Sequence, residues 1–202
     1  MKRPFDWRHT PGFGPLTAAI LVFLYAPLVI LVVYAFNASR MVTIWQGFST
    51  RWFVAIARNG DIRGAAENSL IIAVVATIAS TLIALAGALA LERGTLTVGR
   101  GAVTGMVAMP LVVPEIVVAI TTLVFFSTLG MHHGLLNLMI AHTVFCIPFA
   151  LLPIQARLKD MGGMLEEAGR DLYASEWKLF RRVTLPLLAP AIGAGAIMAF
   201  VI

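Results

Sequence analysis

The chain is poor in charged residues, and this scarcity limits what kind of protein it can be. Of its 202 residues, 12% are Asp, Glu, Lys or Arg and 59% are hydrophobic, whereas a soluble domain carries about 25% charged residues. A water-soluble globule with so few charges would lack the polar side chains needed to cover its apolar core. The composition therefore excludes an ordinary soluble enzyme or a disordered chain and indicates a membrane protein.

Cysteine and metal-binding clusters are also scarce. The single cysteine, Cys146, cannot form an intrachain disulfide, and its apolar neighbours indicate a small buried side chain rather than a reactive thiol. His132 and His133 stand in a predicted turn without a nearby Cys or carboxylate, and His142 stands alone in an apolar run. We therefore expect no metal bound by this chain.

Charged residues are missing altogether from four long stretches of the sequence. Asp, Glu, Lys and Arg do not occur at positions 9–39, 68–91, 116–156 and 183–202. A helix needs about 20 apolar residues to cross a bilayer, so uncharged stretches of this length predict membrane-spanning helices.

Five spans are predicted from these stretches. Their approximate limits are 16–36, 69–91, 102–126 and 135–154, with a fifth that starts near Leu187. The segment 127–134 is a short turn between the third and fourth spans. The fifth span offers only 16 residues before Ile202, so we expect the natural protein to continue beyond this point. The predicted fold is an all-α integral membrane bundle with at least five spans and a missing C-terminal part.

The positions of Lys and Arg predict the orientation of the chain. If the N-terminus is cytoplasmic, eleven of these residues flank the spans on the cytoplasmic side and four lie in the first outer loop. The excess favours a cytoplasmic N-terminus by the positive-inside rule. The outer loop, 37–68, also contains Trp45, Phe48, Trp52 and Phe53, which suit a segment lying on the outer membrane surface. We divide the chain into residues 1–63, with the tail, first span and outer loop, and a membrane core, 64–202.

Eleven of the 25 charged residues lie between Arg157 and Arg182, in a predicted cytoplasmic loop. Gly162-Gly163 interrupts the chain, a short helix is predicted from Met164 to about Tyr173, and Ser175 is the predicted N-cap of a second helix that Pro186 ends. Both helices have one apolar face, formed by Leu165, Ala168 and Leu172 in the first and by Trp177 and Phe180 in the second. A solvated linker is the simpler interpretation, but two capped amphipathic turns favour docking to a cytoplasmic partner.

The segment from Glu166 to Ser175, followed by Val183-Thr184-Leu185-Pro186, resembles the EAA signature of ABC-transporter inner-membrane permeases. The matching positions are Glu167, Ala168, Leu185 and Pro186. Two positions depart from the signature, because Gly169 replaces the usual second Ala and Tyr173 replaces the usual Gly. In the family this Gly lets the chain turn between the two short helices, and a Tyr with positive φ is costly. The turn is therefore expected to differ here, or coupling to be weaker.

The resemblance implies a polytopic bundle of the type I ABC importer permease kind, in which the loop near 157–186 seats in a groove of the ATP-hydrolysing subunit. Glu167 would then meet a basic or polar group of that subunit. The residues expected to couple to the ATPase are Glu166, Glu167, Ala168, Gly169, Asp171, Leu172, Leu185 and Pro186.

The resemblance also implies partners and a location. These are two ABC ATPase subunits, a second permease subunit and an extracytoplasmic solute-binding protein in the inner membrane of a bacterial cell, with no nucleic acid. ATP and Mg²⁺ would bind to the ATPase, so no cofactor is expected on this chain. The segment Gly94–Gly99 has the glycine spacing of a P-loop but lacks its Lys-Ser/Thr, and is predicted to be a turn.

Glu115 lies inside the predicted third span, where a carboxylate costs about 2.5–3.5 kcal/mol to insert. Pro110 and Pro114 are four residues apart and predict a bend there. Pro114 and Glu115 beside the bend are candidates for a path taken by a cationic solute. Alternatively, Glu115 caps a broken helix or pairs with a polar group of a partner subunit.

The stretch 68–116, the pair Trp52-Phe53 and the step Pro114-Glu115-Ile116 are most similar to permeases of the spermidine/putrescine branch. The sequence thus predicts a transport subunit that is not an enzyme, since neither Gly-x-Ser-x-Gly nor His-Glu-x-x-His occurs. A permease for ferric ion, sulfate or thiamine and a membrane scaffold without a transport role remain as alternatives.

Overall fold

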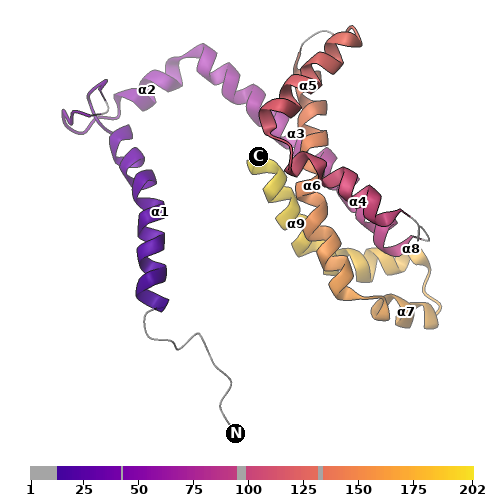
Figure 1. The fold of residues 1–202 in the computed structure, drawn as a ribbon. Helices are drawn as coiled ribbons and strands as arrows, with labels where there is room; N and C mark the ends of the chain where they lie inside the picture. The colour runs from indigo at the N-terminus through magenta and orange to yellow at the C-terminus, as the bar shows by residue number, and fades with distance from the viewer. Residues whose placement is uncertain (1–12, 42, 95–98, 132–133) are drawn as a thin grey trace. The chain divides into compact units, whose positions relative to one another are not determined.

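The computed structural model of the chain describes residues 13–41, 43–94, 99–131 and 134–202. Within these residues every named element is a helix, and the one β-bridge pairs Asn37 with Phe48. In chain order (Figure 1) the elements are α1 (Phe13–Ala35), α2 (Arg51–Arg58), α3 (Gly60–Arg93), α4 (Arg100–Ala108), the 3₁₀ turn η2 (Met109–Leu111), α5 (Glu115–Thr128), α6 (Leu135–Met161), α7 (Met164–Asp171), α8 (Glu176–Leu179), the π turn η3 (Phe180–Thr184) and α9 (Leu185–Val201). The predicted all-α fold is confirmed. Lys2, Arg3, Arg8, His132, His133 and positions 95–98 of the predicted turn lie outside the described residues.

Four helices are long and apolar enough to cross a membrane, and a bent helix pair makes up to five spans. The four are Phe13–Ala35, Gly60–Arg93, Leu135–Met161 and Glu176–Val201, and the bent pair is Arg100–Leu111 with Glu115–Thr128. Each predicted span coincides with one of these segments. The helices are longer than predicted, because α3 already begins at Gly60 and α6 continues to Met161.

The last span differs from the prediction in where it begins. Pro186 was predicted to end the second helix of the cytoplasmic loop, but the helix runs from Glu176 to Val201. The π turn η3 ends at Thr184, two residues before this proline. A wider π turn accommodates both the missing N–H of a proline and its bulky ring, which an ordinary α-turn cannot do without a break. The prediction that Pro186 stops the helix is therefore wrong.

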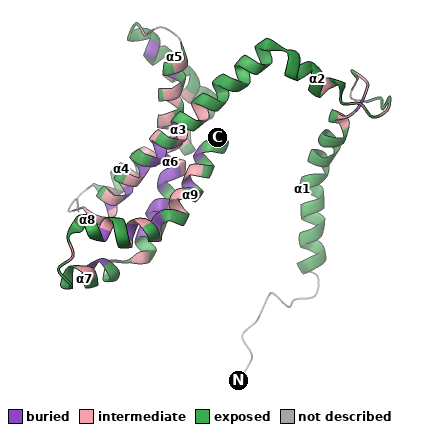
Figure 2. Ribbon diagram, turned by 180° about the vertical axis from the view of Figure 1, so that it is seen from behind, coloured by how far each residue is buried: buried purple, intermediate pink, exposed green. Residues whose placement is uncertain are grey.

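The chain forms two compact units, Met1–Ala65 and Ala66–Ile202. In the first unit, α1 contains no buried residue, and its surface is exposed almost throughout (Figure 2). The loop that follows it is organised around Asn37, which is 2% exposed. The Asn37 side chain donates a hydrogen bond to the carbonyl of Ile44 (2.8 Å) and accepts one from the N–H of Gln46 (3.0 Å). Its backbone carbonyl accepts a hydrogen bond from the Trp52 indole (2.9 Å).

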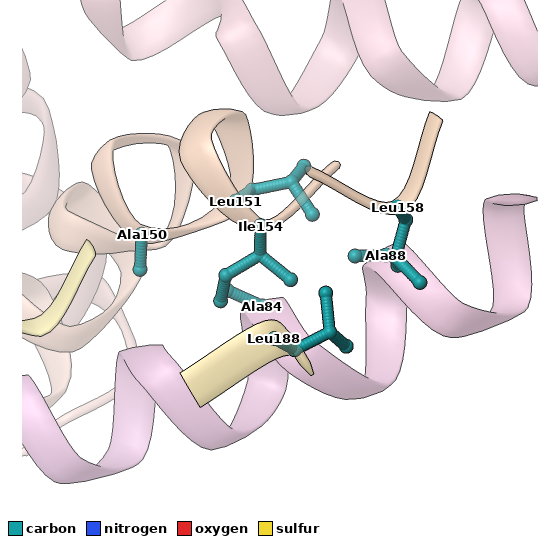
Figure 3. Close-up of a cluster of buried hydrophobic side chains, with 7 residues drawn as sticks. All are labelled: Ala84, Ala88, Ala150, Leu151, Ile154, Leu158 and Leu188. Atoms are coloured by element: carbon teal, nitrogen blue, oxygen red, sulfur yellow. The ribbon is translucent and has the colours of Figure 1, made fainter. Parts of the chain in front are cut away.

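The core of the second unit lies where α3, α6 and α9 meet. Figure 3 shows its buried side chains, which are Ala84, Ala88, Ala150, Leu151, Ile154, Leu158 and Leu188. Alanines four residues apart lie on one face of a helix, and their small side chains allow a close approach of the neighbouring helices. This core includes the last third of α3, the second half of α6 and the start of α9, so it lies next to the charged loop that joins α6 to α9.

Two contacts bring α6 and α9 together farther along their length. Cys146 is buried and its thiol donates a hydrogen bond to the carbonyl of Ala199 (3.5 Å), which confirms its interpretation as a small buried residue. Gly195 faces α6 so closely that a Cβ added there would lie 2.9 Å from the carbonyl oxygen of Ala150. Gly193, on the same helix, has open space at the corresponding position.

These two glycines allow a matched test of helix packing. Both Gly193→Ala and Gly195→Ala raise helix propensity by about 1 kcal/mol, but only the second places a methyl group against the α6 backbone. We expect Gly195→Ala to be less stable than Gly193→Ala by about 1–3 kcal/mol, the usual cost of overpacking. Thermal unfolding of the purified protein in detergent measures this difference, and equal stability of the two variants would contradict the packing described here.

Candidate functional site

The helix pair at the predicted third span is broken at its two prolines. The axes of Arg100–Leu111 and Glu115–Thr128 differ by 101°. Pro110 lies in η2, and Pro114, with extended backbone (φ −54°, ψ 132°), directly precedes α5. The predicted bend at these prolines is confirmed, and it places Glu115 in the first turn of α5.

Glu115 opens onto a groove of about 640 Å³ between α5 and α6. The groove is mainly apolar, and its polar members are Glu115, Thr122, Asn137 and His142. The Thr122 hydroxyl and the His142 ring bond to carbonyls of their own helices, those of Val118 (2.7 Å) and Leu138 (2.9 Å). The Glu115 carboxylate makes no capping bond to α5 and has no hydrogen-bond or ion-pair partner in the part of the chain that the structure describes. Among the described residues that line this groove it is the one acidic side chain.

A second candidate site is the hairpin formed by α7 and α8, residues 164–179, on the loop with the signature residues. Tyr173 joins the two helices with φ +56°, and among the described residues it is the one non-glycine residue with positive φ. Its N–H donates to the carbonyl of Arg170 (2.8 Å), and the N–H of Ala174 donates to the carbonyl of Gly169 (3.1 Å). This pair of bonds is a Schellman motif, in which glycine is usual at the left-handed position. The turn that glycine makes in the signature is therefore kept, with a tyrosine in strained backbone, and the expectation that the turn differs here is wrong.

Two further contacts hold the hairpin in shape. The guanidinium of Arg170 donates two hydrogen bonds to the carboxylate of Glu176, at 2.7 Å and 3.0 Å, across the turn. These bonds and the attraction between the charges raise the pKa of Arg170 above its ordinary value. Leu179, which is 3% exposed, packs so closely on Gly169 that a Cβ there would overlap its side chain. Gly169 thus has a structural reason to replace the alanine of the signature.

The outer face of the hairpin exposes large apolar side chains. Leu172 is 82% exposed, Tyr173 98% and Trp177 67%, and Met164 and Leu165 are exposed too. Exposed apolar patches on a protein surface are typical of sites that bind another molecule. Of the residues predicted to couple to an ATPase, Glu167, Ala168, Asp171, Leu172 and Pro186 are exposed, Gly169 and Leu185 are half-buried, and Glu166 is buried.

Glu166 turns inward and joins three elements. Its Oε2 accepts a hydrogen bond from Arg93 Nε at the end of α3 (2.8 Å), and its Oε1 accepts one from the Thr184 hydroxyl in η3 (2.9 Å). The Glu166 side chain is 8% exposed and that of Arg93 26%. Removing one partner of a buried ion pair costs about 3–5 kcal/mol, because the other charge is left without compensation.

Sequence reasoning missed Arg93 and its neighbour Glu92. The Glu92 carboxylate accepts a hydrogen bond from Gln155 Nε2 (2.7 Å) and pairs with Lys159 Nζ (3.6 Å), both on α6. The sequence shows only that an acidic and a basic residue end the second span, and the partners lie more than 60 positions away. Because basic residues beside spans commonly set the orientation of a membrane protein, the sequence assigned Arg93 to that role alone.

Comparison with known proteins supports the resemblance to ABC-transporter inner-membrane permeases. Residues 81–202 match the family model described as the binding-protein-dependent transport system inner membrane component. The chain is 39% identical to the spermidine/putrescine transport system permease protein PotC of Escherichia coli (strain K12), over 93% of this chain and 70% of that protein. It is 35% identical to the putrescine transport system permease protein PotI of the same strain, over 88% of this chain and 66% of that protein.

A solved structure shares the fold. The chain matches, with a TM-score of 0.70, the crystal structure of a bacterial ABC transporter involved in the import of the acidic polysaccharide alginate. The match covers 98% of this chain and 73% of that chain at 17% sequence identity. At this identity the likeness shows the arrangement of the helices.

Replacing Tyr173 with glycine should stabilise the hairpin. A non-glycine residue in the left-handed region costs about 1 kcal/mol or more, which glycine does not incur. We expect the amide of Ala174, which closes the turn, to exchange about fivefold more slowly with solvent in Tyr173→Gly, because 1 kcal/mol is a factor of about 5 in an equilibrium constant. Tyr173→Ala removes the ring but keeps the strained backbone and serves as the control; equal protection in both variants would contradict the strain argument.

Proposed function

The chain belongs to the family of binding-protein-dependent transport system inner membrane components and is a multi-pass inner-membrane permease of an ABC importer; we propose that its solute is a polyamine such as spermidine or putrescine. The names and the identities of the relatives support this solute. An importer of this kind works with ATPase subunits, a second permease subunit and a solute-binding protein.

The proposed orientation has the N-terminus and the hairpin of α7 and α8 in the cytoplasm. The distribution of Lys and Arg along the sequence supports it, since eleven flank the spans on this side and four lie in the first outer loop. In this orientation the hairpin faces the ATPase subunits, which bind ATP and Mg²⁺. The chain itself contributes no catalytic residue.

The observation that carries the proposed coupling role is the exposed apolar face of the hairpin. Leu172, Tyr173 and Trp177 would leave water on docking, and buried aromatic side chains supply much of the energy of an interface. Glu167, on α7, is also exposed and would pair with a basic group of the ATPase subunit. ATP binding draws the ATPase subunits together, the hairpin follows, and the spans reorient from one side of the membrane to the other.

The groove beside Glu115 is the proposed solute path. A polyamine carries several ammonium groups, and a carboxylate inside a span is tolerated where it faces a cavity rather than lipid. Glu115 faces such a groove and lies beside the broken helix. Its carboxylate would accept hydrogen bonds from a passing ammonium group, while the apolar wall contacts the methylene segments of the polyamine.

Glu115→Gln should reduce polyamine uptake. A hydrogen bond to a charged group is worth about 1.5–3 kcal/mol, so we expect at least about a tenfold loss in the rate at low solute concentration. Uptake of labelled spermidine and putrescine by cells without other polyamine importers measures it. Thr122→Val is the matched control in the same groove, since its hydroxyl bonds to its own helix, and it should keep uptake. Unchanged uptake in Glu115→Gln, at equal membrane levels, would exclude the carboxylate from the path.

Leu172→Ser should weaken association with the ATPase subunit. Burying a leucine side chain is worth about 1.5–3 kcal/mol, so its removal should lower the affinity at least about fivefold. Co-purification from detergent and titration with the isolated ATPase subunit measure it. Lys178→Ser removes an exposed charge from the same hairpin and should change little. Equal binding by both variants would show that the apolar face does not dock.

A further inference from the structure

Helix α7 is attached to the bundle by a single buried side chain. Among its residues Glu166 alone is buried. On one side α7 follows Gly162-Gly163, where Gly162 has φ +59°, and on the other it ends in the turn at Tyr173. The close apolar contact of α7 is that of Gly169 with Leu179 inside the hairpin, and apolar packing against α3 and α6, of the kind that holds most helices in place, contributes little. Unless something else holds it, α7 can turn about the two glycines.

The ion pair between Arg93 and Glu166 supplies that attachment. Arg93 is the last residue of α3, and the same helix contributes Ala84 and Ala88 to the hydrophobic core. The pair is shielded from solvent on the Glu166 side, so it is screened less by salt than a surface pair. The second oxygen of Glu166 is held by Thr184, at the point where the hairpin continues into the last span.

Arg93 also holds the glycine hinge itself. Its Nη2 donates to the carbonyl of Leu158 (3.3 Å) and to the carbonyl of Gly162. Leu158 is a fully buried core residue of α6, and Gly162 is the first residue of the hinge. One planar guanidinium therefore contacts α6, the hinge and α7 at the same time, which a lysine ammonium with its single centre does less well.

We infer that Arg93 and Glu166 are positioning residues for energy coupling, which pass the displacement of the hairpin to α3 instead of letting the hairpin turn about Gly162-Gly163. This inference rests on the proposed function, because it assumes that an ATPase subunit moves the hairpin. It assigns Glu166 a role inside the permease, distinct from that of Glu167 on the exposed face. Because Glu166 is satisfied by Arg93 and Thr184, the ATPase subunit docks without it.

Arg93→Met tests the inference in the complete transporter, reconstituted in lipid vesicles with its ATPase and solute-binding protein. The docking face stays intact, so we expect the ATPase subunit to remain bound. Stimulation of ATP hydrolysis by the solute-loaded binding protein should fall at least about fivefold, the lower range of coupling between sites, and fewer solute molecules should be imported per ATP. In Arg93→Lys the stimulation should be intermediate between those of the wild type and Arg93→Met, since lysine keeps the positive charge but lacks the several N–H donors of the guanidinium.

Lys159→Met is the matched control. It removes an ion pair, with Glu92, from the same end of α3 and α6, but this pair does not touch the hairpin. Normal stimulation is expected. Full stimulation in Arg93→Met, or an equal loss in Lys159→Met, would overturn the inference.

Two further measurements keep the test decisive if Arg93→Met does not accumulate. Thr184→Val leaves the ion pair but removes one hydrogen bond from Glu166. Thr184→Val and Arg93→Lys, each as a single variant, should both lower the stimulation of ATP hydrolysis. Normal stimulation in both variants would overturn the inference. In the permease without its ATPase, Arg93→Lys should speed hydrogen exchange of α7 amides while the core segments of α3 and α6 keep their protection.

The wild-type complex separates the two proposals. Absent stimulation there contradicts the proposed function, whereas stimulation that persists in the variants contradicts the positioning role alone.

Discussion

The buried carboxylate of Glu166 is the contact on which the cytoplasmic end of the second unit depends. It is satisfied on one side by the guanidinium of Arg93 and on the other by the hydroxyl of Thr184. A charge removed from water is stable only when such partners are in place. The three groups come from α3, α7 and η3, so this one carboxylate ties α7 to the end of α3 and the start of the last span, while Arg170 and Gly169 hold it to α8.

The hydrophobic core supports this arrangement from within the membrane. Alanines on α3 and glycine on α9 let these helices pack closely on α6. Small residues suit a membrane bundle because lipid is as apolar as the protein interior, so association depends on close contact and on polar bonds. The core lies beside the residues that hold the hairpin, so a shift of the hairpin meets the packed ends of α3, α6 and α9.

The two candidate sites follow different structural rules. The groove beside Glu115 exists because two prolines break a span and leave a carboxylate at the start of a helix. The hairpin exists because a Schellman turn and the pair of Arg170 with Glu176 fold a charged loop back on itself. Both use backbone irregularities, a break and a strained tyrosine, that a uniform helix would not provide.

The sequence by itself determined the spans, the break at Pro110 and Pro114, and the family, because uncharged runs, prolines and a spaced signature are local features. It could not show that the helix continues past Pro186 after a π turn, that Tyr173 keeps the turn of a glycine, or that Glu166 is buried while Glu167 is exposed. It also left Arg93 among the residues that set topology. The turns at Tyr173 and before Pro186 are backbone conformations that residue type alone does not specify. The pairing of Glu166 with Arg93 was decided by tertiary structure, since the partner of a buried charge is selected by the close packing of helices that are distant in the chain.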